Sequence, residues 1–114
     1  MHIEKFEDSI AWQKSRELTR IIYQSFRGIR DYSFKDQIQR AVISISNNIA
    51  EGFERNTDKE LKHFLFIAKG SVGEVRSMLY AAHDLAYIDE MQFKKLHNLS
   101  YDIARILSGF IKKL

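Results

Sequence analysis

Apolar residues recur along the chain at alternating spacings of three and four, which places them on one side of a helix with 3.6 residues per turn. The pattern occurs in four segments and predicts helices at about residues 8–27, 34–54, 58–85 and 90–113. Proline is absent, so no residue of that type forces a break within these segments. The third segment shows the pattern most clearly, with apolar side chains at Leu61, Leu65, Ala68, Val72, Val75, Leu79 and Ala82.

The connections between these segments are short, and polar residues suited to helix N-caps precede or open each segment: Asp8, Ser33, Thr57 and Asp89. Short connections make successive helices antiparallel neighbours. The sequence therefore predicts a single all-α domain over residues 1–114, folded as an antiparallel up-down four-helix bundle. If the order around the bundle is sequential, the fourth helix lies beside the first.

The composition bears on the cellular compartment of the protein and on its association with membranes. The 114 residues include no cysteine, which excludes disulfides and thiolate metal sites and fits a reducing compartment. The first residues mix acidic and basic side chains, and no segment reaches the roughly 18 uncharged apolar residues that a membrane span needs. A cytoplasmic protein without membrane association is the expectation.

The net charge is only +3, so composition alone does not indicate nucleic-acid binding. The excess is concentrated, however. Between Asp8 and Arg27 there are four basic and two acidic residues, and between Asp89 and Leu114 there are five basic and three acidic residues. The basic excess therefore falls on the first and last predicted helices.

The faces of these two helices that point away from the core combine cations with aromatic rings. On the first helix the outward positions are Trp12, Arg16, Arg20, Tyr23, Arg27 and Arg30, and on the fourth they include Lys94, Tyr101, Arg105 and Lys112. Arginines that bind phosphates, interleaved with rings that stack on bases, suit a nucleic-acid surface. The alternative is that the charges are ordinary solvated positions and the rings pack at a subunit interface.

The outward face of the third helix is small and uncharged, with Phe66, Gly70, Gly73, Ser77 and Ala81. Glycine inside a helix costs about 1 kcal/mol relative to alanine. Close approach of a helix from another subunit would explain two glycines on one face, so we expect an oligomer interface here. The alternative is a monomeric bundle with a slightly destabilised third helix.

No residue pattern indicates catalysis. A di-metal site in a four-helix bundle uses two Glu-x-x-His pairs. Glu60 and His63 match once, but neither His83 nor His97 has a glutamate three residues before it. No Gly-rich phosphate loop is present. We expect no catalytic residue, cofactor or metal, and therefore no enzyme.

One segment, residues 44–55 (SISNNIAEGFER), does not follow simple apolar periodicity. Asn48 and Glu51 could tie the end of the second helix to a neighbouring helix or chain. Gly52 permits a close approach or a left-handed exit, and Arg55 could bind a carboxylate. We interpret the segment as a structural clamp.

Together with FED at residues 6–8, WQK at 12–14, FLFIAKGS at 64–71 and AYI at 86–88, this segment resembles a known family. The family comprises the four-helix-bundle proteins encoded in intervening sequences of bacterial 23S ribosomal RNA genes. The same set is similar to the accessory variability determinant of diversity-generating retroelements. One departure is visible, because Ser46 and Asn47 stand where the family has Pro-Ser, which removes a constraint on the second helix.

The resemblance implies a homopentamer with a basic surface that binds RNA or DNA and, in the retroelement branch, a reverse transcriptase partner. The leading hypothesis is therefore a non-enzymatic, oligomeric nucleic-acid-binding or nucleic-acid-associated accessory protein. The alternative is a protein-interaction scaffold that presents the same basic faces to an acidic protein.

Overall fold

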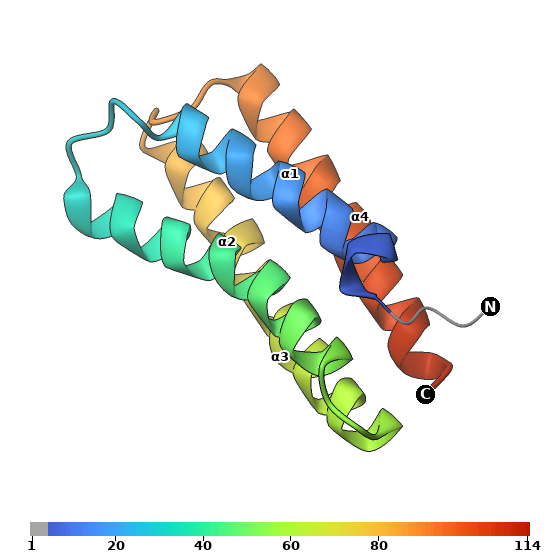
Figure 1. The fold of residues 1–114 in the computed structure, drawn as a ribbon. Coiled ribbons are helices and arrows are strands. Elements are labelled where there is room, and N and C mark those ends of the chain that lie inside the picture. The colour runs from blue at the N-terminus through green and yellow to red at the C-terminus, as the bar shows by residue number, and fades with distance from the viewer. Residues whose placement is uncertain (1–4) are drawn as a thin grey trace.

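The computed structural model describes residues 5–114, which form a short 3-10 helix, η1 (Phe6–Asp8), and four α-helices. The α-helices span Ile10–Ser25 (α1), Tyr32–Phe53 (α2), Asp58–Asp84 (α3) and Glu90–Lys112 (α4). Successive helices run in opposite directions in an elongated bundle of 43 × 22 × 19 Å (Figure 1). The predicted all-α, up-down four-helix arrangement is confirmed.

Each helix packs against two neighbours in sequential order around the bundle. Contacts join α1 to α2, α2 to α3, α3 to α4 and α4 back to α1, whereas no diagonal pair within residues 5–114 is in close backbone contact. Helices α1 and α4 are therefore neighbours, as expected. In the described part of the chain, no helix has a stretch long and apolar enough to cross a bilayer.

The core is built from the faces that the hydrophobic pattern predicts. Fully buried side chains come from all four helices and include Leu18, Ile22, Ile45, Leu65 and Ile103. Burying one such side chain contributes about 1.5–3 kcal/mol relative to leaving it exposed. Two buried serines are satisfied within their own helices, because Ser15 Oγ donates to Ala11 O at 2.6 Å and Ser100 Oγ donates to His97 O at 2.8 Å. Polar atoms at these two core positions thus have hydrogen-bond partners.

Two of the predicted N-caps are correct. Thr57 Oγ1 accepts a hydrogen bond from the Glu60 N–H at 3.1 Å at the start of α3. Asp89 forms a full capping box on α4: its Oδ1 accepts from the Gln92 N–H at 2.8 Å, and Gln92 Oε1 accepts from the Asp89 N–H at 3.0 Å. Such caps stabilise a helix by about 0.5–2 kcal/mol each.

The other two predicted N-caps are wrong. Helix α1 is capped by Ser9, whose Oγ accepts the capping hydrogen bond at 3.4 Å, whereas Asp8 ends η1. Helix α2 starts earlier than expected because Asp31 Oδ1 accepts from the Phe34 N–H at 3.1 Å, which leaves Ser33 inside the helix. In both cases a second capping residue lies within two positions of the predicted one.

Gly52 sets the closest approach of α2 to α3. It is buried, and a Cβ atom at this position would lie 3.0 Å from Leu61 Cδ1 and 3.0 Å from Phe64 Cβ. Its φ angle is not positive, so of the two roles foreseen for Gly52 the close approach applies and the left-handed exit does not. The absence of a side chain at Gly52 lets the two helices meet near their connection.

Helix α3 ends in a Schellman motif centred on Ala86. The Ala86 N–H donates to His83 O at 3.0 Å, and the Tyr87 N–H donates to Ala82 O at 2.8 Å. The φ of Ala86 is 61°, a left-handed conformation that costs about 1–2 kcal/mol in a residue with a Cβ. This reversal leads the chain into the α3–α4 connection.

A hydrogen bond joins that connection to the one between α1 and α2. Both connections lie at the same end of the bundle (Figure 1), and Tyr87 Oη donates to Asp31 Oδ2 at 2.7 Å. This bond and the one from the Phe34 N–H lower the pKa of the Asp31 carboxyl group, since both stabilise its ionised form. The same bond to Asp31 raises the pKa of the Tyr87 hydroxyl.

We expect Gly52→Ala to destabilise the protein by about 1–2 kcal/mol, because overpacking against Phe64 and Leu61 outweighs the gain in helix propensity. Gly109→Ala is the matched control, since Gly109 lies in α4 and a Cβ atom there would meet nothing within 4 Å. It should raise stability by about 0.5–1 kcal/mol. Urea denaturation of both variants measures the difference, and equal stabilisation by the two substitutions would contradict the close approach.

We expect Tyr87→Phe to reduce the free energy of unfolding mainly when Asp31 is ionised. The folded-state pKa of Asp31 is lowered, so its bonds stabilise the fold above the unfolded pKa, and that contribution is lost as the pH falls through the folded pKa. The difference between wild type and variant should therefore be largest above about pH 5 and shrink below about pH 3.9. Tyr32→Phe serves as control in the same denaturation series, and a pH-independent effect of Tyr87→Phe would argue against this linkage.

Candidate nucleic-acid interface

The outer face of α1 and the connection that follows carry the predicted row of arginines: Arg16, Arg20, Arg27 and Arg30. All four side chains are exposed. Trp12 is half-buried and packs edge-on against Phe6, with ring centroids 5.1 Å apart. The Arg16 guanidinium lies 5.8 Å from the centre of the Trp12 ring, so the first cation of the row is held by a cation–π contact.

Carboxylates neutralise little of this row. Within residues 5–114, its one ion pair joins Arg20 Nη2 to Glu17 Oε1 at 4.0 Å, and both side chains are more than half exposed. Exposed pairs of this kind contribute about 0–1 kcal/mol, so Glu17 does not hold Arg20 away from another ligand. The row therefore presents several arginines whose donors face solvent.

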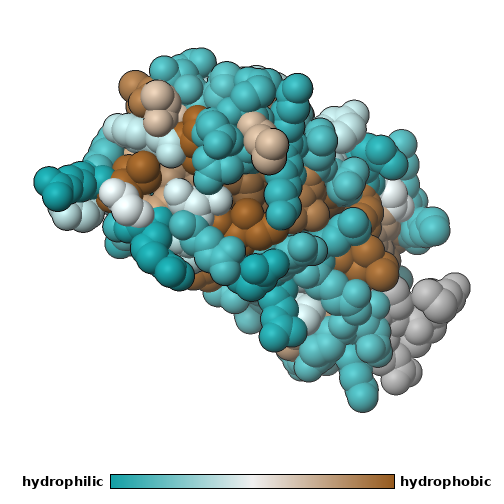
Figure 2. Space-filling view, turned by 90° about the horizontal axis from the view of Figure 1, so that it is seen from above, coloured by the Kyte–Doolittle hydropathy of each residue, from teal (hydrophilic) through white to brown (hydrophobic). Residues whose placement is uncertain are grey.

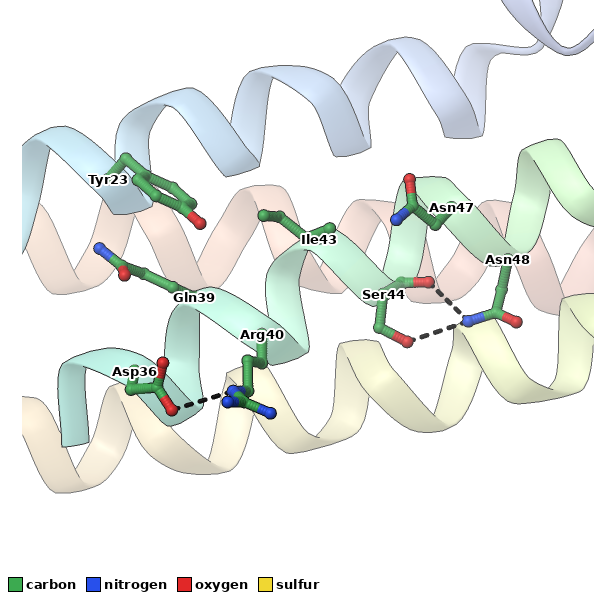
Figure 3. Close-up of a pocket in the computed structure, with 8 residues that line it drawn as sticks. All are labelled: Tyr23, Asp36, Gln39, Arg40, Ile43, Ser44, Asn47 and Asn48. Carbon is green, nitrogen blue, oxygen red and sulfur yellow. Dashed lines mark hydrogen bonds and ion pairs between the residues drawn. The ribbon is translucent and has the colours of Figure 1, made fainter. Parts of the chain in front are cut away.

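Tyr23 directs its ring away from α4 and toward α2. It lines a shallow groove of about 460 Å³ with residues of α2 that include Gln39, Ile43 and Asn47. Figure 3 shows the Tyr23 ring reaching from α1 over this groove, beside the Gln39 and Ile43 side chains. The predicted aromatic member of the row is thus present, but it belongs to the α1–α2 side of the molecule.

The predicted residues of α4 lie at its surface, and one of them, Tyr101, contacts α3. Lys94, Tyr101, Arg105 and Lys112 are all exposed. Lys94 Nζ lies 3.7 Å from Glu90 Oε1. The Tyr101 ring is contacted by the Arg105 guanidinium at 5.9 Å. A second guanidinium, that of Arg76 from α3, lies 5.2 Å from the Tyr101 ring centre.

The structure therefore places the two basic faces on adjacent helices, but their aromatic residues point into different grooves. Tyr23 turns to α2 and Tyr101 turns to α3. Figure 2 looks down on the side of the bundle that carries α1 and α4, the uppermost helices in Figure 1. A band of hydrophobic side chains crosses the middle of this side and is bordered by hydrophilic ones. The aromatic residues of the two basic faces thus lie beside different helices, Tyr23 beside α2 and Tyr101 beside α3.

Arg76 is a residue of this surface that the hydrophobic pattern does not single out. It is half-buried at the edge of α3, and its Nε atom is buried without a hydrogen-bond partner in the described part of the chain. The signal that identifies it is a spacing of seven, because Lys62, Lys69 and Arg76 lie on one edge of the helix. Arg76 lies at an edge of α3, between the core face and the opposite face that the hydrophobic pattern distinguishes.

The segment at the end of α2 behaves as a clamp between helices. Asn48 Nδ2 donates to Ser44 O at 2.8 Å and to Ser44 Oγ at 2.9 Å (Figure 3). Ser44 Oγ in turn lies 2.9 Å from Ser71 Oγ of α3. Arg55 Nη2 pairs with Glu51 Oε1 at 2.7 Å. Helices α2 and α3 are therefore linked by a hydrogen-bond chain as well as by the close approach at Gly52.

Arg55 also reaches α3, because its guanidinium lies 4.7 Å from the centre of the Phe64 ring. This contact fixes the end of α2 over the first turns of α3. Of the four residues singled out in this segment, Gly52 and Arg55 contact α3 directly, whereas Asn48 bonds to Ser44 within α2 and Glu51 pairs with Arg55, so neither of these two reaches another helix. None of these contacts requires a ligand.

The small face of α3 is exposed, as its position on the helix predicts. Phe66 is 52% exposed, and Gly70, Gly73 and Ser77 are exposed, with Ala81 intermediate. A Cβ atom added at Gly70 or Gly73 would meet nothing within 4 Å. Contacts within the described chain therefore give no reason for glycine at these two positions.

Glu60 and His63 have the surface roles expected of a first helical turn. Glu60 Oε1 accepts from Thr57 Oγ1 at 3.0 Å, and the exposed His63 ring packs edge-on against Phe64 at 5.3 Å. Within residues 5–114, no three His, Asp or Glu side chains gather as metal ligands. The candidate chemistry of the described surface consists of cations and rings.

Comparisons with known proteins agree with this architecture. The family model for 23S rRNA-intervening sequence proteins matches residues 7–109. The chain is similar to the crystal structure of a protein with unknown function from the S23 ribosomal protein family of Bacteroides thetaiotaomicron VPI-5482. That match has a TM-score of 0.84 and 25% sequence identity and covers 90% of this chain and 99% of the other.

Among curated proteins, none matches the chain significantly. The family match nevertheless covers nearly the whole sequence, including the segments of residues 44–55 and 64–71 on which the resemblance rests. The chain belongs to the family of 23S rRNA-intervening sequence proteins.

Proposed function

We propose that the protein is a non-enzymatic, oligomeric accessory protein that binds nucleic acid through the basic faces of α1 and α4. The observation that carries the proposal is the row of Arg16, Arg20, Arg27 and Arg30, which has little carboxylate compensation within residues 5–114. A protein of net charge +3 that has four exposed arginines along α1 and the connection after it concentrates its positive charge there.

Arginine suits this role because its planar guanidinium donates several hydrogen bonds and can bind a phosphate with two of them. Helix α1 has 16 residues, which corresponds to about 24 Å of axis along which phosphates can be contacted. The family is named after 23S rRNA, which makes RNA the first nucleic acid to test. The basic residues of α4, namely Lys94, Arg105 and Lys112, would extend the binding surface around the bundle.

Self-association would multiply this surface. The exposed small face of α3 supports an oligomer, because the space beside Gly70 and Gly73 is open within the described chain and suits the close approach of a helix from another copy. Several copies, each with few phosphate contacts, bind a polyanion more tightly together than one copy does. The family resemblance favours five copies.

We expect Gly70→Ala/Gly73→Ala to separate folding from assembly. Alanine should stabilise the bundle by about 0.5–1 kcal/mol per site. Nothing in the described chain opposes a Cβ atom at either position, and alanine reduces the conformational freedom of the unfolded chain. The same methyl groups should weaken the oligomer. Light-scattering mass and thermal unfolding of the variant, compared with Gly109→Ala, measure both effects, and an oligomer of unchanged mass and affinity would argue against this interface.

We expect Arg16→Gln/Arg20→Gln/Arg27→Gln to weaken RNA binding at least tenfold at low salt. Loss of three phosphate contacts should also reduce the slope of log affinity against log salt by about 2–3. Fluorescence anisotropy with labelled RNA across a salt series measures both quantities. Arg40→Gln/Lys59→Gln/Lys113→Gln is the control, because it removes the same charge from elsewhere on the surface.

Equal loss of affinity in the two triple variants would show that net charge, and not the α1 face, determines binding. A wild-type protein that binds neither RNA nor DNA at low salt would overturn the proposal. Recovery of an acidic protein partner from nuclease-treated lysate would then favour the scaffold, which would use the same basic faces for a protein ligand.

A further inference from the structure

We propose that the boundary between α3 and α4 is a binding site for single-stranded nucleic acid, with bases stacked on tyrosines and phosphates held by flanking cations. This inference rests on the proposed nucleic-acid function and assigns single-stranded nucleic acid to the α4 part of the proposed surface, extended onto α3. We call this surface the α3–α4 seam and define it by six residues: Lys69, Arg76, Tyr80, His97, Tyr101 and Arg105.

The α3 side of the seam is a line of three cations followed by a histidine. Lys62, Lys69, Arg76 and His83 are spaced by seven residues, so they share one edge of the helix. Two contacts orient this edge toward α4. Arg76 lies 5.2 Å from the Tyr101 ring centre, and the His83 ring lies 5.0 Å from the Phe93 ring. The edge that carries the lysines therefore borders α4.

The α4 side is a line of rings followed by a cation. Phe93, His97, Tyr101 and Arg105 are spaced by four residues and face the same edge of α3. The Phe93 and His97 rings stack at 5.4 Å with an interplanar angle of 29°. Tyr80 of α3 packs against both of them, at 5.1 Å from Phe93 and 5.3 Å from His97.

Two tyrosines keep much of their ring surface in solvent. Tyr80 is 53% exposed and Tyr101 is 45% exposed, although each is held by neighbours. Tyr80 Oη lies 3.2 Å from His97 Nε2, which fixes the orientation of the Tyr80 ring. Tyr101 is held by the guanidinium groups of Arg76 and Arg105. Exposed rings that are already ordered bind a base with little loss of side-chain entropy.

The cations of the seam are not neutralised within the described chain. None of the ion pairs among residues 5–114 involves Lys69, Arg76 or Arg105. Glu90 lies at one end of the seam, where it is engaged by His83 at 2.9 Å and by Lys94 at 3.7 Å. Glu74 of α3 points to the opposite neighbour, because it accepts a hydrogen bond from Gln37 of α2 at 3.3 Å. The seam thus carries several unpaired positive charges within the described chain, which suits an anionic ligand.

The combination of positive charge and exposed rings favours one class of anionic ligand over the others. An acidic peptide satisfies the cations but leaves the rings without partners, and a duplex satisfies the cations but hides its bases. A single strand satisfies both, since its phosphates bind the cations and its splayed bases stack on aromatic side chains. From Lys62 to Tyr80 the α3 edge is about 27 Å long, which accommodates at most about eight phosphates at 3.4 Å per charge.

The test uses the full-length protein and a labelled, unstructured RNA of about twelve nucleotides, which lies within the range of single-strand site sizes. We expect Tyr80→Leu/Tyr101→Leu to weaken binding of this RNA at least tenfold while leaving the affinity for a duplex of the same sequence within about twofold. Tyr80→Phe/Tyr101→Phe keeps both rings and should retain wild-type affinity. Because Tyr80 lies beside Gly73 and Ser77 on α3, light-scattering mass must show that each variant keeps the wild-type oligomeric state, and thermal unfolding must show that it is folded.

Tyr32→Leu is the matched control. Tyr32 is 68% exposed and has a cation beside it, with Lys35 Nζ 5.2 Å from its ring centre, but it lies at the start of α2 and away from the seam. This variant should bind RNA as the wild type does. In a second arm, Lys69→Gln/Arg76→Gln/Arg105→Gln should lower the salt slope for the single strand by about 2, whereas the tyrosine variants should leave the slope unchanged.

Several results would overturn the inference. Unchanged single-strand affinity in Tyr80→Leu/Tyr101→Leu would exclude base stacking at the seam. If polyglutamate of matched charge inhibits binding of the labelled RNA as strongly as unlabelled RNA does, the ligand of the seam is an acidic protein instead of a nucleic acid. If these tyrosine variants bind normally while the α1 arginine variant loses affinity, the proposed function stands and only the seam fails. A wild-type protein that binds no nucleic acid would overturn both the proposed function and the inference about the seam.

Discussion

Each helix of this bundle has one apolar face, and burying four such faces against one another is the constraint from which the other features follow. Side chains such as Leu18, Ile45 and Ile103 are removed from water completely. Once one face of each helix is committed to the core, its opposite face and two edges remain available for other contacts. The arginines of α1 occupy such a face, and the Arg76–Tyr101 contact occupies such an edge.

The core could be predicted from sequence because apolar residues spaced by three and four mark one side of a helix. The sequential order of the helices was the arrangement that short connections favour. The N-caps Thr57 and Asp89 could also be predicted, since each capping residue has a suitable partner three positions later. The starts of α1 and α2 could not be predicted correctly. At both places two neighbouring residues can cap a helix, and the path of the chain before the helix decides between them.

The candidate site was predictable only one helix at a time. The exposure of Arg16 and Arg105 follows from their distance from the core positions on their own helices. The pairs Arg76–Tyr101 and Tyr80–His97 depend on how α3 and α4 are rotated about their axes, which no single-helix pattern contains. Summing charge over whole helices also concealed the cations of α3, because Glu74 offsets their charge in the sum although it points to α2 and away from the edge that carries Lys69 and Arg76.

The hydrogen bond between Asp31 and Tyr87 joins residues 56 positions apart in the chain. It thereby connects the hairpin of α1 and α2 to the hairpin of α3 and α4 at the end where both reverse direction. Two helical hairpins that share a core but lack such a tie can fray independently at their turns. Here a fluctuation that opens either turn by separating Tyr87 from Asp31 also removes a hydrogen bond from the other turn, so amide hydrogen exchange in the two connections is coupled through that bond.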